Sequence, residues 1–88
     1  MVTVTLPRLL ADLIGGVRQE QVDAHDLSGA LDALCTRHPE LRVHLFDEHQ
    51  HLRPHVTCLI NGEVARDALG RPLTHGDVVT VMQAVSGG

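Results

Sequence analysis

Aromatic side chains are almost absent from this chain. Phe46 is the only phenylalanine, and the 88 residues include no tryptophan or tyrosine. Proteins that hold single-stranded nucleic acid stack its bases on aromatic rings, so the sequence offers no such platform. Because 43% of the residues are nevertheless apolar, we expect a compact core built from Val, Leu, Ile and Ala.

An excess of positive charge is missing as well. Seven Lys and Arg residues stand against eleven Asp and Glu residues, and the net charge is −4 with the histidines neutral. Affinity for nucleic acid comes largely from neutralising phosphates with cationic side chains. The composition therefore predicts no nucleic-acid partner.

Long apolar runs and a cysteine framework are also lacking. No run approaches the ~20 residues of a membrane span, and the N-terminal residues do not show the pattern of a secretory signal. We therefore expect a cytoplasmic protein without membrane contact. Cys35 and Cys58 are too few for a disulfide scaffold and have no CxxC spacing. We interpret them as buried thiols, with a Cys35–Cys58 bridge left open.

The first half of the chain reads as two strands and a helix. Residues 2–6 alternate apolar and polar and predict a half-buried strand, followed by a long loop over 7–16 and a second strand over 17–24. Asp26 is a good N-cap. Apolar residues then recur at helical spacing, and the helix should end near His38 because Pro39 follows. Gly29 should weaken this helix by about 1 kcal/mol relative to Ala.

The second half reads as three strands. A short helical turn around residues 41–46 precedes a strand over 55–60. Asn61-Gly62 is a strong hairpin signal because both central residues of a type I′ turn need positive φ. A short return strand over 63–66 and a last strand over 77–82 complete the pattern.

Alternation along the third and last strands separates two sets of side chains. The residues expected to face the helix are Val56, Cys58, Ile60, Val79 and Val81. Thr57, Leu59, Thr80 and Met82 should lie on the open face. Leu59 and Met82 could then share an exposed apolar patch, which is typical of a docking surface.

The order of elements predicts an α+β fold, in which a mixed sheet of four to five strands packs on one main helix. The first and last strands should be central neighbours. We expect one domain over residues 1–84 and a flexible C-terminal tail over 85–88.

Several stretches resemble a known family. The ending from Gly76-Asp77 through V-V-T-V to A-V-S-G-G resembles the G-D-x-V … V-[SA]-G-G ending of ThiS/MoaD-type sulfur carriers, and VTVTLPRLLADLIGG resembles their first strand and loop. These proteins have the ubiquitin-like β-grasp fold. The chain looks nearest to the actinobacterial CysO-like branch. Gln83 departs from the family, whose members often have proline there, and this should loosen the tail.

The resemblance implies a carrier rather than an enzyme. An E1-like adenylyltransferase/sulfurtransferase would use ATP to activate the carboxylate of Gly88, and a sulfur donor would convert it to a thiocarboxylate. No cofactor is bound by the carrier itself. Gly87 and Gly88 lack a Cβ and can enter a narrow active site. The functional tail is then Val85, Ser86, Gly87 and Gly88, and the partner-binding residues are Leu59, Met82 and Ala84.

Further partners and alternatives remain open at this point. A sulfur-accepting biosynthetic enzyme and a JAMM-type metalloprotease are implied partners. The sulfur could go to cysteine, molybdopterin, thiazole or a secondary metabolite. One alternative is a ubiquitin-like modifier joined to lysine through Gly88. The other is a plain protein-interaction domain.

Four histidines lie close together in the sequence, at positions 44, 49, 51 and 55. His49 and His51 could chelate a metal from one face of a strand. No HExxH pattern or nearby cysteine supports such a site. We therefore predict solvated loop histidines and no metal, and a pH-sensitive partner contact is the other possibility.

Overall fold

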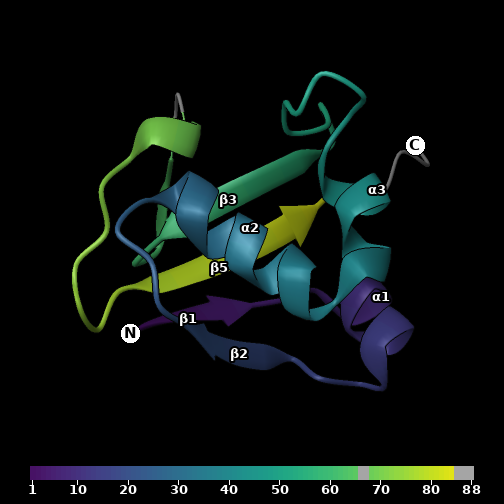
Figure 1. The fold of residues 1–88 in the computed structure, drawn as a ribbon, viewed down its shortest axis with the longest axis horizontal. Coiled ribbons are helices and arrows are strands. Elements are labelled where there is room, and N and C mark those ends of the chain that lie inside the picture. Colours follow the sequence, from purple (N-terminus) through teal and green to yellow (C-terminus); the bar gives the residue numbers. More distant parts are fainter. Residues whose placement is uncertain (66–67, 85–88) are drawn as a thin grey trace.

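Five strands form one mixed sheet in this computed structural model, which describes residues 1–65 and 68–84. The strands lie in the order β2-β1-β5-β3-β4. They are β1 (Val2–Thr5), β2 (Gln19–Val22), β3 (Val56–Ile60), β4 (Glu63–Val64) and β5 (Val78–Gln83). The central strands β1 and β5 are parallel, and the other pairs are antiparallel (Figure 1). The predicted mixed sheet, with the first and last strands as neighbours, is confirmed.

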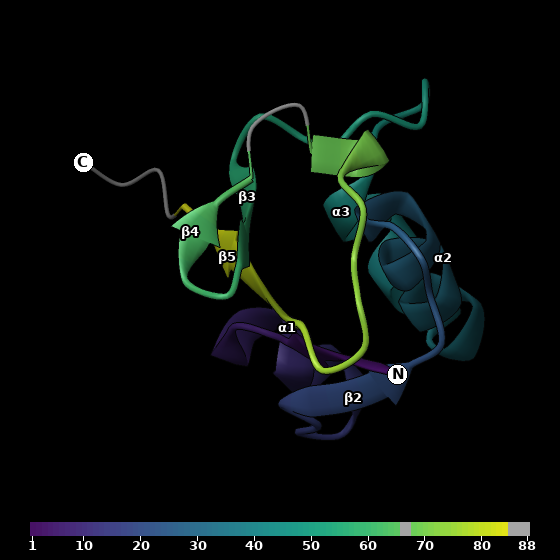
Figure 2. The same cartoon turned by 90° about the vertical axis from the view of Figure 1, so that its left-hand side faces the viewer.

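The main helix, α2 (Leu27–Arg37), covers one face of this sheet (Figures 1 and 2). The Asp26 carboxylate accepts the N–H of Gly29 at 2.7 Å, which confirms the predicted N-cap. A Cβ at Gly29 would lie only 3.0 Å from that carboxylate oxygen. Glycine at this position therefore leaves room for the cap, which offsets its low helix propensity.

Shorter helical segments join the other elements. They are α1 (Arg8–Ala11), η1 (Asp12–Ile14), η2 (Pro39–Leu41), α3 (Arg42–Leu45) and η3 (Ala68–Gly70). The short helical turn predicted around residues 41–46 is confirmed by α3. The loop predicted over residues 7–16 is wrong, because most of this stretch is helical. Leu10 and Ala11 are fully buried there, and this burial stabilises turns too short to form alone.

The strand boundaries differ slightly from the prediction. β2 is two residues shorter at each end than the predicted 17–24. Its partner in the described sheet is the four-residue β1, and the pairing runs from Val2↔Val22 to Thr5↔Gln19. β5 begins and ends one residue later than the predicted 77–82. The predicted return strand over 63–66 is strand as far as Val64, and its last residue lies outside the described residues.

The β3–β4 turn is the hairpin that the sequence predicts. Asn61 and Gly62 have φ of 51° and 86°, as a type I′ turn requires. The Asn61 amide also donates to Asp77 at 3.0 Å and accepts the N–H of Val78 at 2.9 Å. Asp77 in turn accepts the N–H of Thr74 at 2.9 Å. The N-G turn and the G-D pair of the sequence are therefore joined in one network at the start of β5.

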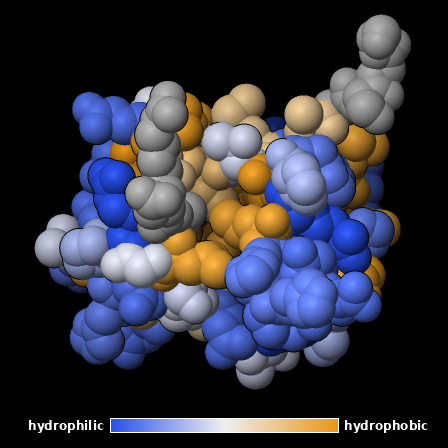
Figure 3. Space-filling view, turned by 90° about the horizontal axis from the view of Figure 1, so that it is seen from above, coloured by the Kyte–Doolittle hydropathy of each residue, from blue (hydrophilic) through white to orange (hydrophobic). Residues whose placement is uncertain are grey.

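The core between sheet and helix is apolar throughout the part of the chain that the structure describes. Seen from above, apolar side chains gather in a central hollow bordered by hydrophilic ones (Figure 3). Cys35 and Cys58 are both free and 1% exposed, which confirms two buried thiols. Burial raises the pKa of Cys58 to about 11. Among residues 1–65 and 68–84, no helix is long and apolar enough to cross a membrane.

Candidate functional site: the open face beside the end of β5

The two faces of β3 and β5 differ sharply in exposure. Val79 and Val81 on β5 are 0% and 1% exposed, whereas Met82 is 50% exposed. On β3, Val56 and Cys58 are buried and Thr57 is exposed. Ile60 and Leu59 are both partly exposed, but Ile60 packs against the core whereas Leu59 lines a groove on the open face. The predicted division between an inward and an outward set is confirmed, and the outward set lies on the face away from α2.

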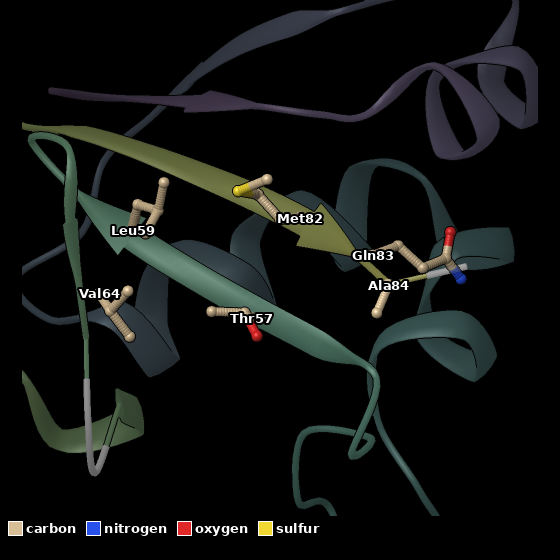
Figure 4. Close-up of a pocket in the computed structure, with 6 residues that line it drawn as sticks. All are labelled: Thr57, Leu59, Val64, Met82, Gln83 and Ala84. Atoms are coloured by element: carbon tan, nitrogen blue, oxygen red, sulfur yellow. The ribbon is translucent and has the colours of Figure 1, made fainter. Parts of the chain in front are cut away.

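A shallow groove of about 250 Å³ lies on this open face. It is lined by Thr57, Leu59, Val64, Met82, Gln83 and Ala84. Figure 4 shows Leu59 and Met82 rising from neighbouring strands on the same side of the sheet, with Val64 beside them on β4. The structure therefore brings together all three residues that we predicted as partner-binding: Leu59, Met82 and Ala84.

Val64 is the lining residue that sequence reasoning missed. It lies directly opposite Leu59 across the hairpin. The Asn61-Gly62 turn carried the necessary signal, because a two-residue hairpin loop sets the register of the strands on either side. Val64 adds to the apolar wall of the groove and is 55% exposed.

The groove is neutral as well as apolar. None of its six lining side chains carries a charge. A partner would therefore gain free energy here mainly by removing apolar surface from water. Thr57 and Gln83 are the polar residues of its lining, and a few polar groups in an apolar lining are usual for recognition sites.

Ala84, the last residue that the structure describes, is still bonded to the sheet. Its N–H donates to the carbonyl of His55 at 2.8 Å, and Val56 lies opposite Gln83. Gln83 thus continues the strand beyond the end we predicted. The predicted tail, Val85, Ser86, Gly87 and Gly88, lies outside the described residues. Its flexibility, and the loosening expected from Gln83, stay predictions.

The histidine-rich stretch forms a separate turn. The Asp47 carboxylate accepts the N–H groups of His51 and His49 at 3.0 and 2.8 Å, and these bonds lower the pKa of Asp47. The rings of His49 and His51 have centroids 6.4 Å apart. Among residues 1–65 and 68–84, no three His, Cys, Asp or Glu side chains converge on a common point where a metal could bind.

Comparison with known proteins identifies the family. Residues 4–88 match the ThiS family. The chain belongs to this family. The match takes in the loop after the first strand and the diglycine ending, both of which carried the resemblance.

Several members with the same fold are similar over nearly their full length. The small archaeal modifier protein 1 of Haloferax volcanii is 38% identical over an alignment of 86 residues, and the match covers 92% of this chain and 97% of that protein. Its crystal structure has a TM-score of 0.89 at 36% identity and covers 99% of this chain and 98% of that one. CysO in the BexX/CysO complex of Amycolatopsis orientalis has a TM-score of 0.90 at 27% identity, and each chain is covered completely.

These likenesses confirm the β-grasp fold and the ThiS-family assignment. The chain is a small ubiquitin-like carrier or modifier protein, and the expectation that it is not an enzyme agrees with its relatives. Identity to the archaeal modifier exceeds identity to CysO, so the role in cysteine biosynthesis that a CysO-like carrier would have stays a prediction.

Proposed function

We propose that this ThiS-family protein is a sulfur carrier. The carboxylate of Gly88 is adenylated by an E1-like enzyme at the expense of ATP, and a sulfur donor then displaces AMP to leave a thiocarboxylate. The thiocarboxylate passes its sulfur to a biosynthetic enzyme. The chain itself binds no cofactor in this scheme, and it works in the cytoplasm.

The observation that carries the proposal is the placement of the groove. Ala84 is bonded to the sheet through its N–H and is also part of the groove wall. Gly88 lies only four positions further along the chain. A partner that docks on Leu59 and Met82 therefore has the diglycine within a short reach of its own active site.

The residue types at the end of the chain suit this chemistry. A carboxylate is a poor electrophile, and adenylation makes its carbonyl carbon open to attack by a sulfur nucleophile. Gly87 and Gly88 lack the Cβ that would crowd a narrow channel and the carbonyl carbon. The relative from Amycolatopsis orientalis was solved in a complex with a second protein, BexX, which supports a role in which this fold is presented to a partner.

Intact-mass spectrometry tests the proposal. The chain is incubated with ATP, sulfide and the E1-like enzyme of its source. The expected product is heavier than the starting chain by the difference between one sulfur and one oxygen atom. A control without ATP should keep its original mass. An adenylate that forms and hydrolyses without ever yielding this product would contradict the sulfur-carrier role.

A protein modifier is the second candidate, and the 38% identity to an archaeal modifier protein favours it. In that case Gly88 would end in an isopeptide bond to a lysine of another protein. Cell extract supplied with ATP and epitope-tagged chain should then contain lysine-linked conjugates. Both functions begin with adenylation, so the product after that step distinguishes them.

A plain interaction domain is the remaining alternative. Deletion of Gly87-Gly88 should abolish thiocarboxylate formation while the rest of the chain stays folded. A plain binding domain would be indifferent to this deletion. The pathway is best assigned by identifying the enzyme that accepts the sulfur. A JAMM-type metalloprotease would be the expected partner if cleavage must first expose the C-terminal Gly88.

A further inference from the structure

The chain contains no lysine. All seven of its cationic side chains are arginines, among them Arg53 and Arg71. The guanidinium group stays protonated at any physiological pH, so it does not attack carbonyl carbon. The side chains of this protein therefore include no amine that could act as an acyl acceptor.

The two thiols are withdrawn from the surface as well. Cys35 and Cys58 are each 1% exposed. Burial raises the pKa of both, which keeps them protonated near neutral pH. Because the thiolate is the nucleophile, neither cysteine can compete for an activated carbonyl while the protein is folded.

The α-amine of Met1 lies at the other end of the sheet from Ala84. It lies 3.0 Å from Nδ1 of His75, and the Met1 carbonyl accepts the N–H of Gly76, before the first residue of β5. Ala84 follows the last residue of β5. The six residues of β5 span about 20 Å at the rise of a β-strand, so Ala84 is at least about that far from the Met1 amine. Four residues span at most about 14 Å even when fully extended, so the carbonyl of Gly88 cannot reach this amine of its own chain.

We infer that the folded protein is a donor only: it offers no amine or thiol that can capture its own activated C-terminus. This inference rests on the proposed activation of Gly88. In the reaction that is avoided, an amine nitrogen attacks the carbonyl carbon of the adenylate. A C–N bond forms, the C–O bond to AMP breaks, and the amine proton passes to solvent. The resulting amide would be a dead end for sulfur transfer.

The same feature restricts what the protein can join. A second copy offers no side-chain amine, so branched chains of this protein through lysine cannot form, even if it acts as a modifier. The histidines do not change this conclusion, because an acyl-imidazole is hydrolysed by water and leaves no stable product. Apart from the exposed α-amine of a second copy's Met1, the acceptor must therefore be another protein or a small sulfur nucleophile.

A chemically activated chain tests the inference without any adenylating enzyme. Thiolysis of an intein fusion gives the protein with an α-thioester at Gly88. Two variants accompany the natural chain. His55→Lys places an amine at the exposed residue whose carbonyl holds Ala84. Arg71→Lys places an amine at an exposed residue at the Met1 end of the sheet. The neighbouring Leu73 donates its N–H to the carbonyl of His25, which follows the end of β2 that pairs with Val2.

Intact mass followed over time at about pH 8 reports capture. A tethered amine has an effective concentration in the millimolar range. At micromolar protein concentration, His55→Lys should therefore form a lactam and release the thiol. This reaction should be at least about tenfold faster than any amine capture in the other two proteins. The natural chain and Arg71→Lys should only hydrolyse. Lactam or covalent dimer from the natural chain at the His55→Lys rate would overturn the inference, and so would a folded His55→Lys chain that is not captured. Because the thioester is installed chemically, either result is independent of whether the protein is adenylated in its proposed function.

Discussion

The two faces of β3 and β5 are built from alternate residues of the same strands, yet they serve different purposes. Val79, Val81 and Cys58 lie against the helix-covered core and are at most 1% exposed. Leu59 and Met82, on the opposite face, line a groove that nothing in the described chain covers. Period-two alternation thus separates the residues that stabilise the fold from those available for recognition. The comparison predicts that neighbouring substitutions will have unlike consequences.

Aspartate substitutions at positions 81 and 82 should show the largest difference in stability between the two faces. Val81→Asp would bury an unpaired carboxylate, at a cost of several kcal/mol, which is a large part of the ~5–15 kcal/mol that stabilises a typical domain. Met82→Asp places its charge in water and should leave the chain folded. Circular dichroism and urea unfolding measure both variants. Equal loss of structure in the two would show that the faces do not differ in this way.

Recognition should be lost on the open face alone. Leu59→Asp is expected to weaken binding to the E1-like enzyme by at least about tenfold, or roughly 1.4 kcal/mol, since it puts a charge in a neutral, apolar groove. Val43→Asp is the matched control, because Val43 is also exposed, at 64%, but lies on α3 away from the groove. Titration calorimetry compares them. Similar affinities for the two variants would argue against docking on the groove.

The packing of α2 on the sheet can be destabilised at a residue far from the groove, without loss of partner affinity. Asp26→Ala removes the N-cap of α2 and should lower the free energy of unfolding by about 1 kcal/mol. Urea denaturation measures this change. Affinity for the enzyme should stay within error of the natural chain, because the sheet and groove are untouched. A parallel fall in affinity would mean that helix and groove are coupled.

The smallest expected effect is a pH dependence at the start of β5. The N–H of Thr74 and the amide of Asn61 hold the pKa of Asp77 below its ordinary value of 3.8. Because the folded pKa is the lower one, Asp77 contributes stability above pH 3.8 that is lost as pH falls through the folded pKa. Urea midpoints between about pH 5 and 3 should therefore fall less steeply in Asp77→Asn. Identical slopes would show that this network adds no pH dependence.

Local patterns accounted for most of the fold. The capped helix, the Asn61-Gly62 turn and the alternation on β5 could be predicted because each depends on residues close in sequence. The helical stretch after Pro7 could not. Its four-residue α1 is too short for a clear period and depends on burial of Leu10 and Ala11 by other elements.

The candidate site was predictable only in part, for a related reason. Leu59 and Met82 followed from alternation on two separate strands. The places of Val64 and His55 depend on the register between strands, which brings Val64 opposite Leu59 and the His55 carbonyl to Ala84. Such pairings belong to the tertiary structure and cannot be predicted from either strand alone. The absence of lysine, by contrast, could be read in the sequence, but its meaning required the buried thiols and the remote Met1 amine.

The central claim is that the end of the chain is the reactive part of this protein. ATP–pyrophosphate exchange catalysed by the E1-like enzyme tests it most directly, with the natural chain and Gly88→Ala compared at equal concentration after circular dichroism has shown that both are folded. The account predicts exchange with the natural chain and at least about a tenfold loss with the variant, since a transition-state penalty of roughly 1.4 kcal/mol is enough for that factor. Equal exchange with both chains would contradict it.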